Sequence, residues 1–251
     1  MGISKTQGIV LKYTNLGEAD KILTILTRNK GKLKAVAKGC RKPKSSLLAS
    51  SELFAFSEFV LYKGSSLYHI TQAETRETFY NLRNDLLKLS YAVFFVEMAD
   101  AVSEEELSSE RLFLLLAKAL YYLAEGEIPV GLICLAYQLK VMDISGYRPS
   151  LQRCVHCGKT EVQEYKFDIV LGGIICNACK KFEKNTIKIS SGSLETIRIL
   201  LNSEISRLNT LKIDNTIFNE IDKLTKRFVE AHLDKHFKSL DFLNEIKNSN
   251  I

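Results

Sequence analysis

The chain has 251 residues, of which 46% are hydrophobic and 25% are charged, and it contains only 3 Pro. This composition supports a buried core and excludes a chain that is disordered throughout. No apolar run approaches the roughly 18 to 20 residues that a membrane span requires, so we expect no membrane association and a cytoplasmic location.

The charge is unevenly distributed along the chain. Residues 1–80 carry 13 Lys and Arg against 6 Asp and Glu, whereas residues 81–145 carry 5 against 10. The formal net charge of the whole chain is +6. A basic N-terminal part followed by an acidic middle indicates a polyanionic partner for the basic part.

The N-terminal third predicts strands separated by turns. β-Branched or alternating stretches bounded by turn residues predict strands over residues 8–11, 21–27, 32–38, 54–62 and 67–75. The stretch Asn29-Lys30-Gly31 predicts a hairpin turn, because Gly accepts the left-handed conformation. Five antiparallel strands in about 75 residues fit a small closed barrel of the OB type, and an SH3-like barrel fits nearly as well.

From Asn81 onward the apolar residues repeat with the period of a helix. We expect helices over residues 82–96, 112–123, 130–145, 194–201, 217–237 and 240–246. The expected fold class is therefore α+β. It consists of a barrel domain at residues 1–80 and a helical domain at residues 81–251, which a zinc finger at residues 147–189 interrupts. Within that finger, residues 166–175 resemble a hairpin.

Four of the six Cys form two close pairs, Cys154-Val155-His156-Cys157 and Cys176-Asn177-Ala178-Cys179. Two residues between thiols allow one tight turn to direct both sulfurs toward one tetrahedral metal ion. Four protein ligands leave no position for water or substrate, so we predict one structural Zn²⁺. Free core thiols and a redox Cys-x-x-Cys are the alternatives. Lys159, Lys180 and Lys181 would offset part of the thiolate charge.

Histidines offer weaker metal candidates. His156 lies between two of the predicted ligands and is either a ligand, a neighbour of one, or an exposed side chain. His232 and His236 are spaced i, i+4 on a predicted helix and could share one face toward a metal. An ordinary amphipathic helix end explains that pair equally, since no third ligand is evident.

A second strong pattern is a run of basic residues that contains no acid. It comprises Arg28, Lys30, Lys32, Lys34, Lys38, Arg41, Lys42 and Lys44. On a strand whose other face holds Leu33, Ala35 and Ala37, the alternation places a row of ammonium groups on the outside. Such a row attracts phosphate backbones, and Tyr13, Tyr62 and Tyr68 could stack on bases. The alternative is a solvated charged face.

The sequence motifs typical of enzymes are incomplete or missing in this chain. Gly158-Lys159-Thr160 resembles the end of a P-loop, but Arg153 stands where the first Gly is needed. A zinc-deaminase His-x-Glu and a Gly-x-Ser-x-Gly elbow are also missing. The sequence therefore predicts a protein that is not an enzyme.

Taken together, these stretches resemble the RecO family of DNA repair and recombination mediators. The stretch Gly31–Lys42 is similar to the basic strand and loop of the family, and Glu52–Glu74 to its last two barrel strands. The stretch Gly146–Pro149, followed by Cys154–Gly158, resembles the entry into its zinc knuckle. The order and spacing of these pieces make the resemblance specific over nearly the full chain.

The resemblance implies an OB barrel, a helical domain and an embedded zinc finger. It also implies binding to single- and double-stranded DNA, annealing of complementary strands, and help in loading a RecA-type recombinase on gapped DNA. The implied partners are RecR and the C-terminal tail of the single-stranded-DNA-binding protein, and the implied location is the nucleoid within the cytoplasm. There are two alternative hypotheses: an RNA-binding or translation-associated zinc protein, and a zinc-bearing nucleic-acid enzyme.

Overall fold

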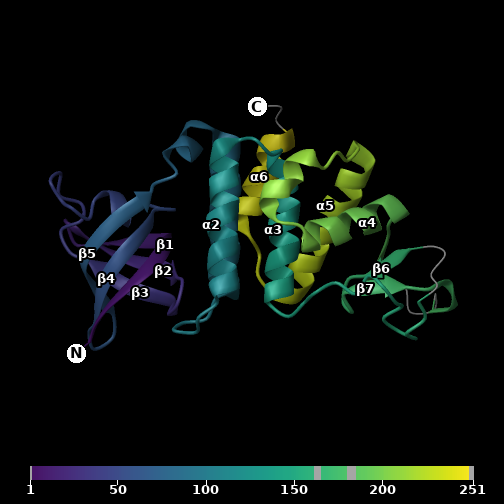
Figure 1. The fold of residues 1–251 in the computed structure, drawn as a ribbon, viewed down its shortest axis with the longest axis horizontal. Coiled ribbons are helices and arrows are strands. Elements are labelled where there is room, and N and C mark those ends of the chain that lie inside the picture. The colour runs from purple at the N-terminus through teal and green to yellow at the C-terminus, as the bar shows by residue number, and fades with distance from the viewer. Residues whose placement is uncertain (1, 161–164, 180–184, 249–251) are drawn as a thin grey trace. The chain divides into compact units, whose positions relative to one another are not determined.

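A computed structural model of the chain describes residues 2–160, 165–179 and 185–248 (Figure 1). Its contacts divide the chain into two compact units. Unit 1 comprises residues 1–126 together with residues 237–251, and unit 2 comprises residues 127–236. The division does not coincide with the change from strands to helices near residue 80. The domain boundary expected there therefore stays a prediction.

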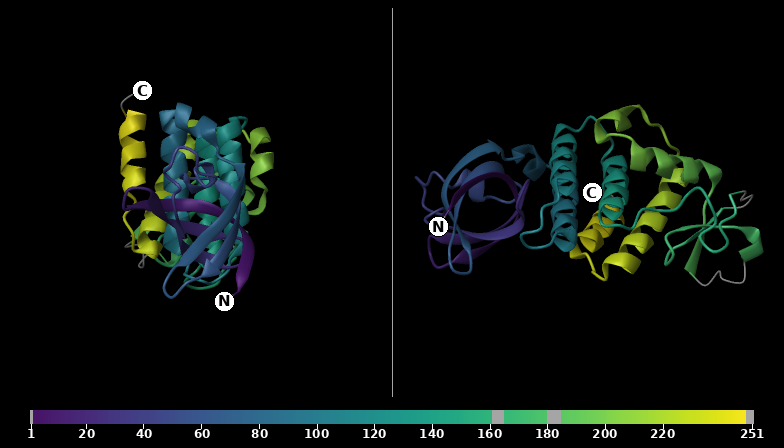
Figure 2. Two further views of the ribbon diagram at one scale, coloured as in Figure 1. Left: turned by 90° about the vertical axis from the view of Figure 1, so that its left-hand side faces the viewer. Right: turned by 60° about the horizontal axis from the view of Figure 1, so that its bottom comes forward.

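Unit 1 contains a closed barrel of five strands (Figure 2). These are β1 (Ile3–Leu16), β2 (Asp20–Thr27), β3 (Gly31–Ala37), β4 (Phe56–Lys63) and β5 (Tyr68–Glu77). They pair in the order β1-β2-β3-β5-β4, and β4 closes the barrel on β1. All pairs are antiparallel except β3 with β5. The predicted fold class, with an OB-type barrel in place of an SH3-like one, is confirmed.

The barrel interior is filled by alternate side chains of its strands. A β-bulge between Val10 and Lys12 shifts the register in β1, which is longer than the predicted strand. The interior residues include Val10, Leu23, Ile25, Leu33, Ala35, Phe59 and Leu61. Burial of each Val, Leu, Ile or Phe side chain in this interior stabilises the barrel by about 1.5 to 3 kcal/mol.

Three helices accompany the barrel in unit 1. They are α1 (Leu86–Val102), α2 (Glu110–Glu125) and α6 (Lys238–Asn248), and a short 3-10 turn, η2 (Tyr80–Asn84), leads into α1. Side chains of Asp85 and Ser109 accept the N–H groups that open α1 and α2. Helix α1 packs against both α2 and α6, and Phe94 meets Phe237 edge to face at 5.6 Å.

Unit 2 combines helices with a small sheet. It contains α3 (Val130–Ile144), α4 (Ser191–Asn202), the 3-10 turn η4 (Ile205–Thr210) and α5 (Asn215–Leu233). The sheet has the order β7-β6-β8, made by β6 (Lys166–Asp168), β7 (Gly173–Ile175) and β8 (Thr186–Lys188). The predicted hairpin at residues 166–175 is thus present. Strand β8 was not predicted, because three residues are too short to show a period of two.

Two predicted helices have other bounds in the structure. The helix expected at residues 82–96 is α1, which begins at Leu86 and continues to Val102. The helix expected at residues 217–237 ends at Leu233, because Asp234 adopts the left-handed conformation with φ of +42°. His236 therefore does not continue the helix that carries His232, and the predicted i, i+4 pair on one helix is not formed. None of the helices among the described residues has the length and apolarity needed to cross a bilayer.

Candidate metal centre and nucleic-acid interface

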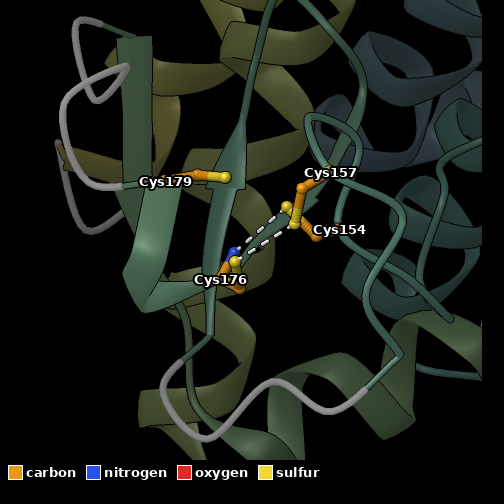
Figure 3. A group of neighbouring side chains, drawn as sticks. All are labelled: Cys154, Cys157, Cys176 and Cys179. Carbon is orange, nitrogen blue, oxygen red and sulfur yellow. Dashed lines mark hydrogen bonds between the residues drawn. The ribbon is translucent and has the colours of Figure 1, made fainter.

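The four predicted zinc ligands come together in unit 2 (Figure 3). The sulfur atoms of Cys154, Cys157, Cys176 and Cys179 all lie within 4.8 Å of one another. A tetrahedral zinc with Zn–S bonds of about 2.3 Å separates its sulfurs by about 3.8 Å. The sulfurs of Cys157 and Cys176 are 3.5 Å apart, so the cluster can hold such an ion after small side-chain shifts.

Two backbone loops present these thiols. The first loop turns back on itself, because the Gly158 N–H donates to the Cys154 carbonyl at 2.9 Å and the Cys154 N–H to the Lys159 carbonyl at 2.7 Å. Gly158 has φ of +77°, which explains why Gly follows the first Cys pair. The second pair follows directly after β7, and the Cys176 N–H points at the Cys154 sulfur, 3.4 Å away. N–H groups directed at sulfur stabilise thiolates.

The thiols already differ in acidity before any metal binds. Burial opposes ionisation of Cys154, but the backbone N–H groups of Cys157 and Cys176 outweigh it and lower the pKa of the Cys154 thiol to about 6. Burial and the neighbouring thiols raise the pKa of Cys179 to about 12. Four thiolates this close together repel one another, and a cation between them would relieve that repulsion. The donor set fits a divalent ion that prefers sulfur, as zinc does.

The other predicted metal contacts do not join this cluster. His156 lies between two of the Cys ligands, but its Nε2 atom is 3.4 Å from a carboxylate oxygen of Asp168. The Nδ1 atom of His232 forms a hydrogen bond with the Phe228 carbonyl oxygen, 2.9 Å away. Among the described residues, the four Cys form the one group that could hold a metal ion. Lys180 and Lys181, predicted to offset the thiolate charge, lie outside the described residues.

The outer face of β3 has an acidic neighbour. Residues 100–110 run from the last turn of α1 to the first residue of α2 and contain five carboxylates, and we call them the acidic segment: Asp100, Glu104, Glu105, Glu106 and Glu110. This segment runs beside β3, where Lys32 and Glu105 form a parallel bridge. The predicted open row of ammonium groups is therefore partly covered, and only 16% of the Lys32 side chain is exposed.

Ion pairs connect the acidic segment to the barrel. Lys12 and Lys32 pair with Asp100 at 2.8 and 3.1 Å, Lys34 with Glu105 at 2.7 Å, Lys63 with Glu106 at 2.6 Å and Arg28 with Glu110 at 2.7 Å. Hydrogen bonding to Glu105 raises the pKa of Lys34, and the same bond lowers the pKa of Glu105. Burial opposes ionisation of Asp100, yet Lys12 and Lys32 lower the pKa of that carboxyl below its ordinary value.

Backbone contacts fix the same arrangement. The Lys32 N–H donates to the Glu104 carbonyl at 3.2 Å, and the Glu106 N–H donates to the Lys32 carbonyl at 2.9 Å. Gly31 has φ of +69°, and a side-chain carbon placed there would lie 2.3 Å from the Leu107 carbonyl oxygen. Only Gly lets the segment approach this closely. The acidic segment is therefore part of the folded unit.

The eight predicted DNA contacts consequently fall into two groups of four. Arg28, Lys32 and Lys34 are paired with acids, and the charge of Lys30 acts on Glu106. The second group follows β3 and is exposed throughout; we call it the basic loop, Lys38, Arg41, Lys42 and Lys44. Among the described residues, no carboxylate pairs with Lys38, Lys42 or Lys44, while Arg41 donates to the Gly17 carbonyl at 3.1 Å. The basic loop is the part of the run that remains open to an anion.

Sequence reasoning missed the partners Lys12 and Lys63 and the role of the acidic segment. The signal was present as Glu104-Glu105-Glu106, in an acidic stretch directly following a basic one. We interpreted that asymmetry as attraction to an external polyanion. In the structure, about half of the basic run meets this acidic stretch inside the same unit.

Comparison with known proteins agrees with this architecture. Family models described as the N-terminal and C-terminal parts of recombination protein O match residues 1–79 and 83–241. The chain is 39% identical over 243 residues to a DNA repair protein RecO from Alkaliphilus metalliredigens, covering 96% of this chain and 99% of the relative. It is 34% identical over 246 residues to a DNA repair protein RecO from Acetivibrio thermocellus, covering 98% of each. The chain therefore belongs to the RecO family of DNA repair proteins.

Proposed function

We propose that this chain is a recombination mediator that binds single- and double-stranded DNA through the barrel and anneals complementary strands. The observation that carries the proposal is the basic loop, whose exposed cations on an OB-type barrel lack carboxylate partners among the described residues. Four cations on one short loop attract a phosphate backbone through the release of its counterions. Membership in a family of DNA repair proteins supports DNA as the polyanion.

The mechanism needs no chemical step. Two complementary strands repel each other through their phosphates, and neutralisation of these phosphates by a basic surface lowers the barrier to their encounter. Base pairing between the strands then supplies the sequence specificity, so the protein is not required to read bases. The missing nucleotide-binding motifs are in keeping with a protein that is not an enzyme.

Zinc and protein partners complete the proposal. One structural Zn²⁺ on Cys154, Cys157, Cys176 and Cys179 would stabilise unit 2, because four thiolates fill its coordination. The mediator would act with RecR and with the C-terminal tail of the single-stranded-DNA-binding protein, in the nucleoid, to help load a RecA-type recombinase on gapped DNA. A barrel domain at residues 1–80 would supply the DNA contacts, and the helical region with its zinc finger the partner contacts.

An annealing assay tests this function. Complementary strands, either naked or coated by their binding protein, are mixed with the protein in the presence and absence of ATP. We expect faster duplex formation without any requirement for ATP. Failure to anneal even naked DNA, or a dependence on ATP, would contradict the mediator function. Faster annealing of RNA than of DNA would favour the RNA-binding alternative.

A further inference from the structure

One exposed aromatic ring lies on the hairpin whose turn is bonded to the basic loop. Tyr13, near the end of β1, is 42% exposed. Three hydrogen bonds join the loop to the turn between β1 and β2: Arg41 N–H to the Ala19 carbonyl (2.9 Å), Arg41 Nη1 to the Gly17 carbonyl (3.1 Å), and Gly39 N–H to Asp20 Oδ1 (2.7 Å). The hairpin that carries the ring and the loop that carries the cations are therefore held together.

The ring itself rests on a fixed support. The ammonium of Lys21 lies 4.0 Å from the centroid of the Tyr13 ring. Lys21 is almost completely buried, and it is held by Glu52 at 3.0 Å and by the Ser51 carbonyl at 3.3 Å. A buried cation thus covers one face of the ring and holds the ring in place. The exposed part of Tyr13 remains available to a second flat group.

The other two tyrosines that the sequence suggested for stacking are already engaged. Tyr62 stacks on His69, with ring centroids 4.8 Å apart and planes 10° apart. The Tyr68 hydroxyl donates to Glu106 of the acidic segment at 2.9 Å. Tyr62 also lies far along the barrel from Tyr13. It pairs with Ile3 of β1, and at the usual rise per residue Ile3 and Tyr13 are roughly 33 Å apart along that strand. Tyr13 is the one of the three that lies on the hairpin bonded to the basic loop.

We propose that Tyr13 is a stacking platform for an unpaired base whose phosphates bind the basic loop. Bases in a duplex are already stacked on their neighbours, so only a single strand can place the face of a base on this ring. The subsite would therefore add affinity for single strands and leave the affinity for duplexes unchanged. It rests on the proposed DNA binding by the barrel and adds a means to distinguish the two forms of DNA.

Binding of oligonucleotides by the full chain tests the subsite. We expect Tyr13→Ala to weaken binding of a single strand by about tenfold, the loss typical of one stacked base, and Tyr13→Phe to bind as the unchanged protein does. Binding of a duplex of equal length should be unaffected by either change. The matched control is Tyr80→Ala, since Tyr80 is 66% exposed but belongs to η2 outside the barrel. The control should bind both forms normally.

A single strand of abasic sites provides a second test, because it keeps the phosphates and lacks the bases. The unchanged protein should bind a single strand of abasic sites more weakly than one with bases, and Tyr13→Ala should reduce that difference. Equal losses for single strands and duplexes in Tyr13→Ala, or no loss at all, would overturn the stacking role. If the unchanged protein binds neither form of DNA, the proposed function itself fails, which is a different result from a loss of preference.

Discussion

At the scale of single residues, Gly31 decides whether the acidic segment can lie on the barrel. Its φ is +69°, and an added side-chain carbon would meet the backbone of Leu107. A change to Ala therefore adds a steric clash to the cost of left-handed backbone. At Gly146 and Gly158, which also have positive φ, nothing lies within 4 Å of an added carbon, so only the cost of the left-handed backbone applies.

A pair of glycine variants separates the two costs. Gly17 has φ of +58° but nothing within 4 Å of the added carbon. We expect Gly17→Ala to lower the free energy of unfolding by about 1 kcal/mol and Gly31→Ala by about 3 kcal/mol. Urea unfolding of both variants measures the difference. Equal losses would mean that the segment does not approach Gly31.

The cysteine ligands are the second set of residues with a specific test. We expect the purified protein to contain one zinc per chain by elemental analysis and Cys176→Ser to lose it, with a lower melting temperature. Folding and metal binding are linked at such sites, so a chelator should lower the melting temperature of the unchanged protein as well. Cys134→Ser removes a buried thiol of α3 outside the cluster and should keep the zinc. Protein that contains no metal would contradict the prediction.

At the scale of elements, the acidic segment makes the stability of unit 1 depend on pH. Lys12 and Lys32 lower the pKa of Asp100 below 3.8, and hydrogen bonds to Lys34 and Lys63 lower the pKa of Glu105 and Glu106 below 4.5. Carboxylates with lowered pKa stabilise the folded state above their ordinary pKa values. This contribution is lost as the pH falls through the lower values of the folded state.

An isosteric substitution isolates the share of one carboxylate. We expect Asp100→Asn to lower the free energy of unfolding by about 1 to 2 kcal/mol at pH 7, because the ammonium groups of Lys12 and Lys32 lose the negative charge of their partner. The difference should shrink as the pH falls below the ordinary range of Asp and through the lowered pKa of Asp100, because the carboxylate of the unchanged protein then becomes protonated. Urea unfolding between pH 7 and pH 3 measures both. Glu125→Gln serves as control, and a similar pH-dependent loss there would argue against a specific role of the segment.

At the scale of the whole molecule, patterns that depend on local spacing predicted the architecture well. Five alternating strands, helices with period 3.6 and two Cys pairs each require only neighbouring residues to be recognised. The helix end at Leu233 was missed because the left-handed residue that ends it is Asp234, whereas the usual sequence signal for such an end is Gly. The spacing of the cysteines likewise predicted which sulfurs would meet, since each tight turn fixes two of them.

The charge run was harder to interpret because its meaning depends on contacts between distant residues. Lys32 and Lys42 belong to the same basic run, and the sequence gives no reason to treat them differently. In the structure Lys32 binds Asp100, which is 68 residues away in sequence, while Lys42 stays exposed. Alternation places a side chain on a face, but it gives no information on which segment later covers that face. Charge complementarity between the two stretches was the available signal.

We expect DNA to contact the basic loop and not the acid-paired part of the run. Two triple variants that remove equal charge test it directly: Lys38→Gln with Lys42→Gln and Lys44→Gln, and Arg28→Gln with Lys32→Gln and Lys34→Gln. The measurement is the dependence of the DNA-binding constant on salt concentration, since each lost phosphate contact reduces the slope of the logarithmic plot by about 0.7 to 0.9. We predict that the loop variant loses roughly 2 from this slope, whereas the acid-paired variant keeps its slope and is less stable. An unchanged slope in the loop variant, or an equal loss in both, would contradict the account.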